Sequence, residues 1–258
     1  MTLTRRHFTQ GLLAGTAAAG LAAPAIGQGK TKLKLILNWT YQGPQAWFFL
    51  AQDKGYFDQA GIEIEMDQGN GSGAAVGQVA SGAYDVGFGD VNALIRLAAT
   101  NPEEAPLCVY QMYNKPPFTV AVLQSSDIMT AEDLQGRKLG GAANDGALKL
   151  FPAFASVAGL DTSDIEILNF KSNLREQMLK SEQVEGVFGY VNTIRFSAKL
   201  SGMDPDADIR FINYGDYGMD LYSNGIIVPK AMAADQPELV KGLNWAINEG
   251  IKDTLADP

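Results

Sequence analysis

The chain has 258 residues, of which 46% are hydrophobic and 19% are charged, and its formal charge is −9. This composition is typical of a globular protein and is sufficient for one large or two smaller α/β domains. A single cysteine excludes an intrachain disulfide, a single histidine excludes a zinc site built from several histidines, and the negative charge disfavours nucleic acid as a partner.

Residues 1–28 have the pattern of an export signal. The segment MTLTRRHFTQ carries two arginines and no acid, the short apolar run GLLAGTAAAGLAA follows, and small residues near Ala25–Gly27 offer a cleavage site. The pair Arg5-Arg6, followed by Phe8, resembles a twin-arginine signal, which predicts export of a folded protein to the periplasm. Because the apolar run is shorter than the ~20 residues that span a bilayer, we expect no membrane insertion of the mature chain.

Cleavage after residue 28 would change which chemistry the chain can perform. The mature chain would lose His7, the only histidine, and two arginines, so its formal charge would change from −9 to −11. Without histidine, Ser-His-Asp and Cys-His catalysis are excluded. We therefore expect no catalytic residue, no metal and no cofactor.

The first part of the mature chain alternates strands and helices. The segment 62–66 alternates apolar and acidic residues, which predicts a half-buried strand, and Ser72 stands where it would cap a following helix. We expect Trp47 and Phe48 on the buried face of a helix. The predicted strands are 34–39, 62–66, 85–90 and 107–113, and the predicted helices are 45–57, 72–80 and 91–99.

A second cycle of the same kind follows Pro116-Pro117. A short helix is predicted at Thr130, where Asp133 occupies the position of the acid in a capping box. The last helix is predicted from about Pro237, with Trp245 in the core. The other predicted strands are 118–123, 137–142, 165–170, 184–188, 209–214 and 223–228, and the other helices are 145–159, 174–181 and 192–200.

Two such cycles predict an α/β fold with two doubly wound lobes and a cleft between them. The chain would cross between the lobes near 113–119 and 218–225. We therefore assign residues 29–116 and 219–258 to lobe 1 and residues 117–218 to lobe 2. The last helix meets the end of the chain with no closing element, so we expect the native chain to extend beyond Pro258.

The order of motifs resembles the solute-binding proteins of ABC importers, in particular the group that binds thiamine-pyrimidine precursors, nitrate, taurine and alkanesulfonates. The resemblance covers nearly all of the mature chain and is most specific in AQDKGYFDQAGIEI and DLQGRKLG. It also includes GAAVGQVASGAYDVGFGD and SNGIIVPKAMAADQPELV. It implies a type II periplasmic binding protein that traps a small-molecule ligand by hinge bending, acts as a monomer and delivers the ligand to a permease.

Within that group, LNW after the first strand looks like the pyrimidine-binding branch. In that branch a tryptophan stacks on the ligand ring and a Gly-Tyr element of the other lobe faces it, which implies these roles for Trp39 and Tyr190. The branch has an acid shortly after the tyrosine, where this chain has Asn192. This departure puts an aminopyrimidine ligand in question.

The candidate site follows from the rule that ligands bind outside the carboxyl ends of the strands in an open α/β sheet. Trp39 and Tyr190 are alternatively packing residues, Asp90 and Asp145 are alternatively helix caps, and Ser72 is alternatively part of a plain glycine-rich turn. The predicted ligand-binding residues are Asn38, Trp39, Gln42, Ser72, Gly73, Asp90, Tyr113, Asn144, Asp145, Tyr190, Asn192 and Tyr222.

These loops contain no arginine or lysine, whereas a nitrate or sulfonate site would be expected to use a cation or several helix N-termini. The leading hypothesis is therefore a binding protein for a small nitrogenous heteroaromatic compound. The alternatives are a binder of a sulfonate, nitrate or other small anion, a sensor that presents its ligand to a membrane receptor, and an enzyme. The enzyme alternative comes from a pyrimidine synthase in the same superfamily that uses its own histidine, which the mature chain lacks.

Overall fold

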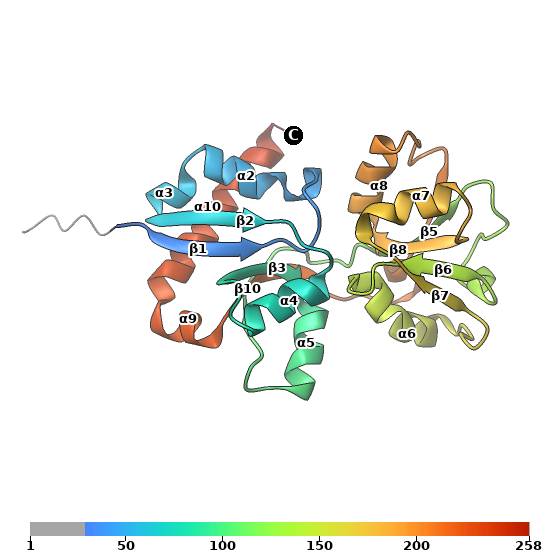
Figure 1. The fold of residues 1–258 in the computed structure, drawn as a ribbon, viewed down its shortest axis with the longest axis horizontal. Coiled ribbons are helices and arrows are strands. Elements are labelled where there is room, and N and C mark those ends of the chain that lie inside the picture. The colour runs from blue at the N-terminus through green and yellow to red at the C-terminus, as the bar shows by residue number, and fades with distance from the viewer. Residues whose placement is uncertain (1–28, 258) are drawn as a thin grey trace, which may run out of the picture. The chain divides into compact units, whose positions relative to one another are not determined.

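The structure is a computed structural model, and it describes residues 29–257; the predicted export signal lies outside the described residues. Regular structure begins at Thr31, and the chain from there on forms one compact unit built on two five-stranded sheets (Figure 1). Within residues 29–257, no helix is long and apolar enough to cross a membrane.

The first sheet has the strand order β2-β1-β3-β10-β4. Strands β1, β2 and β3 are parallel, and β10 runs antiparallel to both β3 and β4. Helices α4 and α5 cover one face and α2, α3 and α10 the other (Figure 1). The strands are β1 (Thr31–Ile36), β2 (Ile62–Asp67), β3 (Val86–Asp90), β4 (Leu107–Gln111) and β10 (Asn224–Val228), and the helices are η1 (Gly43–Gln45), α2 (Ala46–Asp53), α3 (Tyr56–Gln59), α4 (Ser72–Ala80), α5 (Val91–Thr100), α9 (Lys230–Asp235) and α10 (Pro237–Ala256).

The second sheet has the order β7-β6-β8-β5-β9. Helix α6 packs on one face, and α7 and α8 pack on the other. The strands are β5 (Phe118–Leu123), β6 (Lys138–Gly141), β7 (Glu166–Asn169), β8 (Gly186–Tyr190) and β9 (Ile209–Asn213), and the helices are η2 (Glu132–Leu134), α6 (Gly146–Ala158), η3 (Ser172–Leu174), α7 (Arg175–Lys180), α8 (Val191–Leu200) and η4 (Tyr214–Tyr217). We call each sheet with its helices a lobe.

The two lobes have the same topology. Strand β8 takes the central place in the second sheet that β3 takes in the first, and β5 takes the place of β10. Both central strands are fully buried, with the sequences VGFGD in β3 and GVFGY in β8. Because such strands are covered on both faces, they read as apolar runs rather than as alternating patterns, which is why the sequence identifies them.

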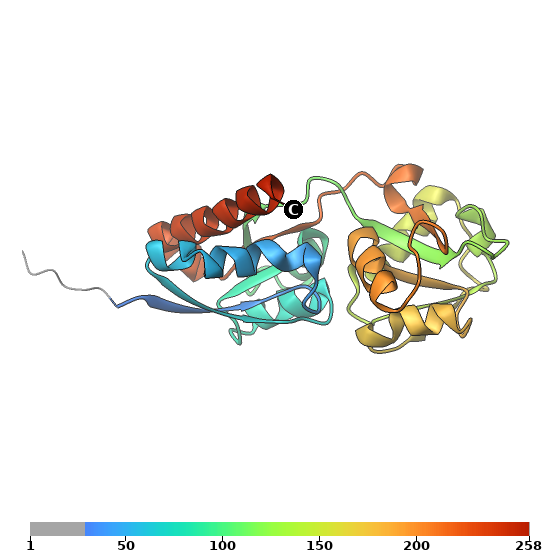
Figure 2. The same cartoon turned by 90° about the horizontal axis from the view of Figure 1, so that it is seen from above.

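Two segments connect the lobes (Figure 2). They are bonded to each other, since the amides of Met112 and Tyr113 donate to the carbonyl of Asn224 at 3.1 and 2.9 Å, and the amide of Ser223 donates to the carbonyl of Tyr113 at 3.0 Å. The predicted lobe boundaries at 116/117 and 218/219 stay predictions, and both fall between the last strand of one sheet and the first strand of the other.

Three predicted features differ from the structure. The first strand ends at Ile36 rather than Trp39, because the carbonyls of Asn38 and Trp39 turn away to accept from the amides of Gly71 and Gly69. The predicted helix 45–57 is divided at Gly55, whose φ of 71° is left-handed. Trp245 is 41% exposed rather than in the core, where its ring contacts Tyr56 edge-on.

The close packing of α10 on α2 gives a stability prediction. A Cβ at Gly250 would lie 2.3 Å from the Trp47 carbonyl oxygen, whereas a Cβ at Gly77, in the middle of α4, would meet nothing within 4 Å. We expect Gly250→Ala to lower the free energy of unfolding by about 1–3 kcal/mol because it overpacks this contact. The matched control Gly77→Ala should raise it by about 0.5–1 kcal/mol through helix propensity. Urea unfolding measures both changes in stability. Equal unfolding midpoints for the two variants would show that α2 and α10 can move apart without cost to accommodate the added methyl group.

Candidate functional site

The loops at the carboxyl ends of the central strands from both lobes meet at one small cavity. Its volume is about 10 Å³, which is room for no more than one water molecule. The cleft between the lobes is therefore closed at this point. The cavity is lined by Asn38, Trp39, Gly71, Ser72, Asp145, Gly146, Tyr190 and Thr193.

Tyr190 joins the lobes through its hydroxyl group. It is the last residue of β8 and is 4% exposed, and its ring contacts Phe118 edge-on with centroids 5.3 Å apart. The hydroxyl donates to Oδ1 of Asn224 at 3.0 Å and lies 3.1 Å from Oγ of Ser72, both in the first lobe. Burial raises the pKa of Tyr190 well above its ordinary value, so the hydroxyl stays neutral and keeps its proton for these bonds.

Asp90 and Asp145 cap helices, as the alternative interpretation predicted. Oδ1 of Asp90 accepts from the amide of Asn92 at 3.0 Å, and Oδ1 of Asp145 accepts from the amide of Ala147 at 2.8 Å. Burial raises the pKa of Asp90 to about 6. Burial also raises the pKa of Asp145, against the positive charge of Arg175, which lowers it. Capping occupies one oxygen of each carboxyl group, and of the two residues only Asp145 lines the cavity.

Ser72 does not cap its helix, which corrects the prediction for this residue. The cap position of α4 is Gly71, with φ 132°, and Ser72 is the first residue of the helix. A side chain at Gly71 would also collide with the second lobe, because its Cβ would lie 2.3 Å from the carbonyl oxygen of Asn144. Glycine at this position therefore allows the lobes to close, and it leaves the Ser72 hydroxyl free for Tyr190.

Arg175 brings a cation to the site, which the sequence analysis did not predict. It is the first residue of α7 and is 1% exposed, and its Cζ lies 4.9 Å from the centroid of the Trp39 ring in the other lobe. Trp39 itself is 4% exposed. The argument that the site lacks a cation was wrong, because it considered only the loops that directly follow strands, and Arg175 reaches Trp39 only through the packing of α7.

The loop after β1 supplies the side-chain amide groups of Asn38, Gln42 and Gln45. Nε2 of Gln45 donates to Oδ1 of Asn38 at 3.1 Å, and both side chains are buried. Oε1 of Gln45 and Oε1 of Gln42 are buried without a hydrogen-bond partner among the described residues. Unpaired buried acceptors are costly, so this loop retains hydrogen-bonding capacity that the closed form does not use.

Four of the remaining predicted residues pair across the lobes at the edge of the cavity, and one lies apart. The amide of Gly73 donates to the carbonyl of Asn144 at 3.4 Å, and Nδ2 of Asn192 donates to the hydroxyl of Tyr113 at 3.3 Å. Tyr222 is 61% exposed and contributes only its carbonyl, which accepts from Asn92. The structure thus does not bring the Tyr222 ring to the cavity.

Asn224 and Thr193 were not among the predicted site residues. Asn224 is fully buried, and its Nδ2 has no partner among the described residues. A repeat in the sequence would have indicated this region, since FGDVN at 88–92 recurs as FGYVN at 188–192. The repeat gives Asp90 and Tyr190 equivalent places at the ends of β3 and β8, and Asn224 pairs with Asp90 in the sheet.

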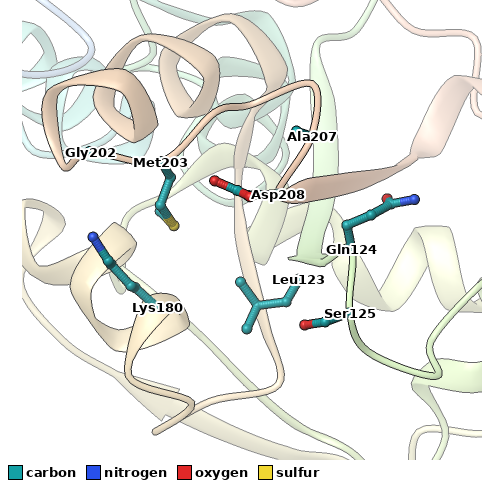
Figure 3. A pocket seen from close by; sticks show the side chains of 8 residues that line it. All are labelled: Leu123, Gln124, Ser125, Lys180, Gly202, Met203, Ala207 and Asp208. Atoms are coloured by element: carbon teal, nitrogen blue, oxygen red, sulfur yellow. The ribbon is translucent and has the colours of Figure 1, made fainter.

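Larger hollows lie outside this cavity. Hollows of about 620 and 560 Å³ share Asn70, Ser172 and Asn173, and so lie where loops of both lobes meet. Another hollow of about 460 Å³ lies between Leu123, Lys180 and Asp208 in the second lobe (Figure 3). It is at the opposite end of β8 from Tyr190, because Leu123 ends the antiparallel strand β5. Ligands in such sheets bind at the carboxyl ends, which disfavours the hollow at Leu123.

A metal site has no support in the described part of the chain. There, no group of three or more His, Cys, Asp or Glu side chains is arranged to hold an ion. The polar side chains that line the cavity are instead the amide of Asn38, the hydroxyls of Ser72, Tyr190 and Thr193, and one capping carboxyl, that of Asp145. These groups can recognise a small polar molecule by hydrogen bonds and stacking.

Comparisons with known proteins agree with this geometry. A family model described as NMT1/THI5 like matches residues 44–258. The chain is 23% identical to the 4-amino-5-hydroxymethyl-2-methylpyrimidine phosphate synthase of Legionella pneumophila, over 89% of this chain and 71% of that one. It is 24% identical to the riboflavin-binding protein RibY of Chloroflexus aurantiacus, over 94% of this chain and 68% of that one.

Among solved structures, the chain is similar to the alkanesulfonate-binding protein SsuA of Xanthomonas axonopodis pv. citri bound to MOPS. The TM-score is 0.67 and the identity 18%, over 85% of this chain and 73% of that one. At this identity the similarity concerns the fold, which is the two-lobed fold of periplasmic binding proteins. The predicted fold class is therefore confirmed.

The burial of Asp90 predicts a pH dependence of stability. A pKa of about 6 in the folded chain, above the ordinary value of 3.8 for an aspartate, means that the folded chain binds the proton more tightly than the unfolded chain. This group therefore lowers stability as pH rises through that interval, by about 2 kcal/mol between pH 4.5 and 7.5. Asp90→Asn keeps the cap acceptor, so the variant should gain about that much relative to wild type at pH 7.5.

Urea unfolding of the variant and wild type at both pH values measures this difference. Asp161→Asn is the matched control, because Asp161 is an exposed turn residue whose pKa is lowered by its bond to the Ser163 amide. Its substitution should change the pH dependence in the opposite direction. Parallel pH profiles of Asp90→Asn and wild type would contradict the burial of an ionised Asp90.

Proposed function

Because the chain belongs to the NMT1/THI5-like family, we propose that it is the periplasmic binding component of an ABC importer and captures a small planar nitrogen heterocycle between its lobes. Residues 1–28 export it, the ligand closes the lobes, and the closed form presents the ligand to the permease. The observation that supports this proposal is the convergence of Trp39 with hydrogen-bonding side chains from both lobes on one cavity.

The charges at the site favour a neutral or weakly basic ligand. Arg175 is matched by Glu176, whose Oε1 lies 2.8 Å from Nη2, while Asp90 and Asp145 add buried carboxyl groups. A ring that carries N–H groups can donate to these carboxyl oxygens. An added anion would instead share a buried space with them, and burying like charges together is unfavourable.

A small anion is the second candidate. Arg175 favours it, as does the similarity in fold to a sulfonate-binding protein. Arg175 already has Glu176 as its carboxylate partner, which disfavours an anion. A bound anion would also lie near the carboxyl group of Asp145, which would then have to be hydrated or protonated.

An enzyme is the third candidate, since one relative is named a pyrimidine phosphate synthase. The residues at the cavity favour binding over catalysis. Both carboxyl groups act as helix caps, and the Tyr190 hydroxyl is held by Ser72 and Asn224. We therefore propose a transport role with no catalytic residue.

A thermal-shift panel on the mature chain tests the ligand class. We expect 4-amino-5-hydroxymethyl-2-methylpyrimidine or riboflavin to raise the melting temperature, and taurine and nitrate to leave it unchanged. A ligand at 100 times its Kd adds about 2.7 kcal/mol of stability. A shift with taurine or nitrate and none with the flat rings would overturn the heterocycle proposal in favour of the anion.

Trp39 is the residue whose substitution tests the site itself. We expect Trp39→Ala to weaken binding of the stabilising ring at least tenfold, because stacking and buried area are lost together. The matched control is Trp245→Ala, since Trp245 is 41% exposed on α10. Isothermal titration gives both affinities, and circular dichroism confirms folding. An unchanged affinity in Trp39→Ala would assign Trp39 to packing alone.

A further inference from the structure

Arg175 retains one unused hydrogen-bond donor next to Trp39, which lines the cavity. Its Nε donates to Oε1 of Glu176 at 2.8 Å, and Nη2 contacts the same oxygen at 2.8 Å and donates to Oγ of Ser197 at 3.1 Å. Nη1 is buried and has no hydrogen-bond partner among the described residues. Three contacts to two side chains therefore fix the guanidinium, and its third nitrogen remains unpaired.

A buried cationic N–H group without a partner is costly, so its retention needs an explanation. Nη1 packs closely against Gly189, because a Cβ at that position would lie 2.5 Å from it. Contact with the Trp39 face at 4.9 Å offsets part of the cost by a cation–π interaction. That contact crosses from one lobe to the other, so opening of the cleft would release the Trp39 face and the guanidinium together.

We propose that Arg175 determines specificity in this site: its Nη1 donates a hydrogen bond to an acceptor atom on the edge of the planar ring that stacks on Trp39. This inference rests on the proposed function and narrows the ligand class. The ring must carry a bare ring nitrogen or an exocyclic carbonyl oxygen on the edge that faces α7.

The geometry favours a single acceptor over a full anion. Carboxylate and sulfonate groups are bound best by two parallel N–H groups of one guanidinium. Glu176 already occupies Nε and Nη2, which are one such pair. One nitrogen is left, and it matches one acceptor atom of a neutral ring.

The test compares one ring with its all-carbon analogue. The first probe is 4-amino-5-hydroxymethyl-2-methylpyrimidine, and the second is (2-amino-4-methylphenyl)methanol, which keeps the same substituents but lacks both ring nitrogens. Arg175→Met alone would leave Glu176 as a buried, unpaired charge, which destabilises the folded chain. The test variant is therefore Arg175→Met/Glu176→Gln, and Glu176→Gln alone is the matched control. Titration calorimetry on the full mature chain gives the four affinities and those of wild type.

We expect wild type and Glu176→Gln to prefer the pyrimidine, and the double variant to lose affinity for the pyrimidine by about 10- to 100-fold, the range for one buried hydrogen bond to a charged donor. Its affinity for the carbon analogue should stay within about twofold of the Glu176→Gln value, because that ring has no acceptor to lose. This pattern separates donation from a merely structural role, which would weaken both rings equally.

Other outcomes overturn the proposal in distinguishable ways. Wild type could bind both rings with equal affinity, or the double variant could lose affinity for both rings equally. Either result would show that Arg175 does not donate to a ring acceptor, although the heterocycle proposal stands. If wild type binds neither the pyrimidine nor riboflavin, the heterocycle proposal fails and this assignment fails with it. If taurine binds wild type and loses its affinity in the double variant, Arg175 is an anion ligand instead.

Discussion

The closed cleft depends on the Tyr190 hydroxyl, which is a neutral group that crosses from one lobe to the other. It meets Ser72 at the start of α4 and Asn224 at the start of β10, and all three side chains are buried. A hydroxyl suits this place because it both donates and accepts without a charge to desolvate. The two carboxyl groups nearby would be far more costly without their helix amides, and so closure brings together groups that are each already partly satisfied.

The same closure leaves several groups unsatisfied, and three of them belong to side chains that contact residues lining the cavity. Oε1 of Gln45, Nδ2 of Asn224 and Nη1 of Arg175 are buried without a hydrogen-bond partner within residues 29–257. Native proteins rarely retain such groups in a core, because each costs about 1–3 kcal/mol. A ligand that supplied a donor for the first and acceptors for the other two would recover this energy, which is how binding could favour the closed form over the open one.

Much of the architecture could be predicted from the sequence because its signals are local. The buried central strands read as short apolar runs, the positions of Asp90 and Asp145 before helices indicated caps, and the strand-end rule selected the loops that line the cavity. The end of the first strand was placed too late, since the turn at Asn38 is made by bonds to Gly69 and Gly71, which are distant in sequence. Arg175 could not be found in this way, because its place on Trp39 is set by how a short helix packs across the cleft.

The connection between the lobes also sets how they can move. The two connecting segments are bonded to each other through Tyr113, Ser223 and Asn224, so they form a short two-stranded ribbon rather than two independent tethers. A hydrogen-bonded ribbon bends across its flat face more easily than it shears in its plane, because bending leaves the bonds intact. The lobes are thus confined to one principal direction of travel. Asn224 also accepts the hydrogen bond from the Tyr190 hydroxyl. The same residue therefore takes part both in the connection between the lobes and in the contact that closes the cleft.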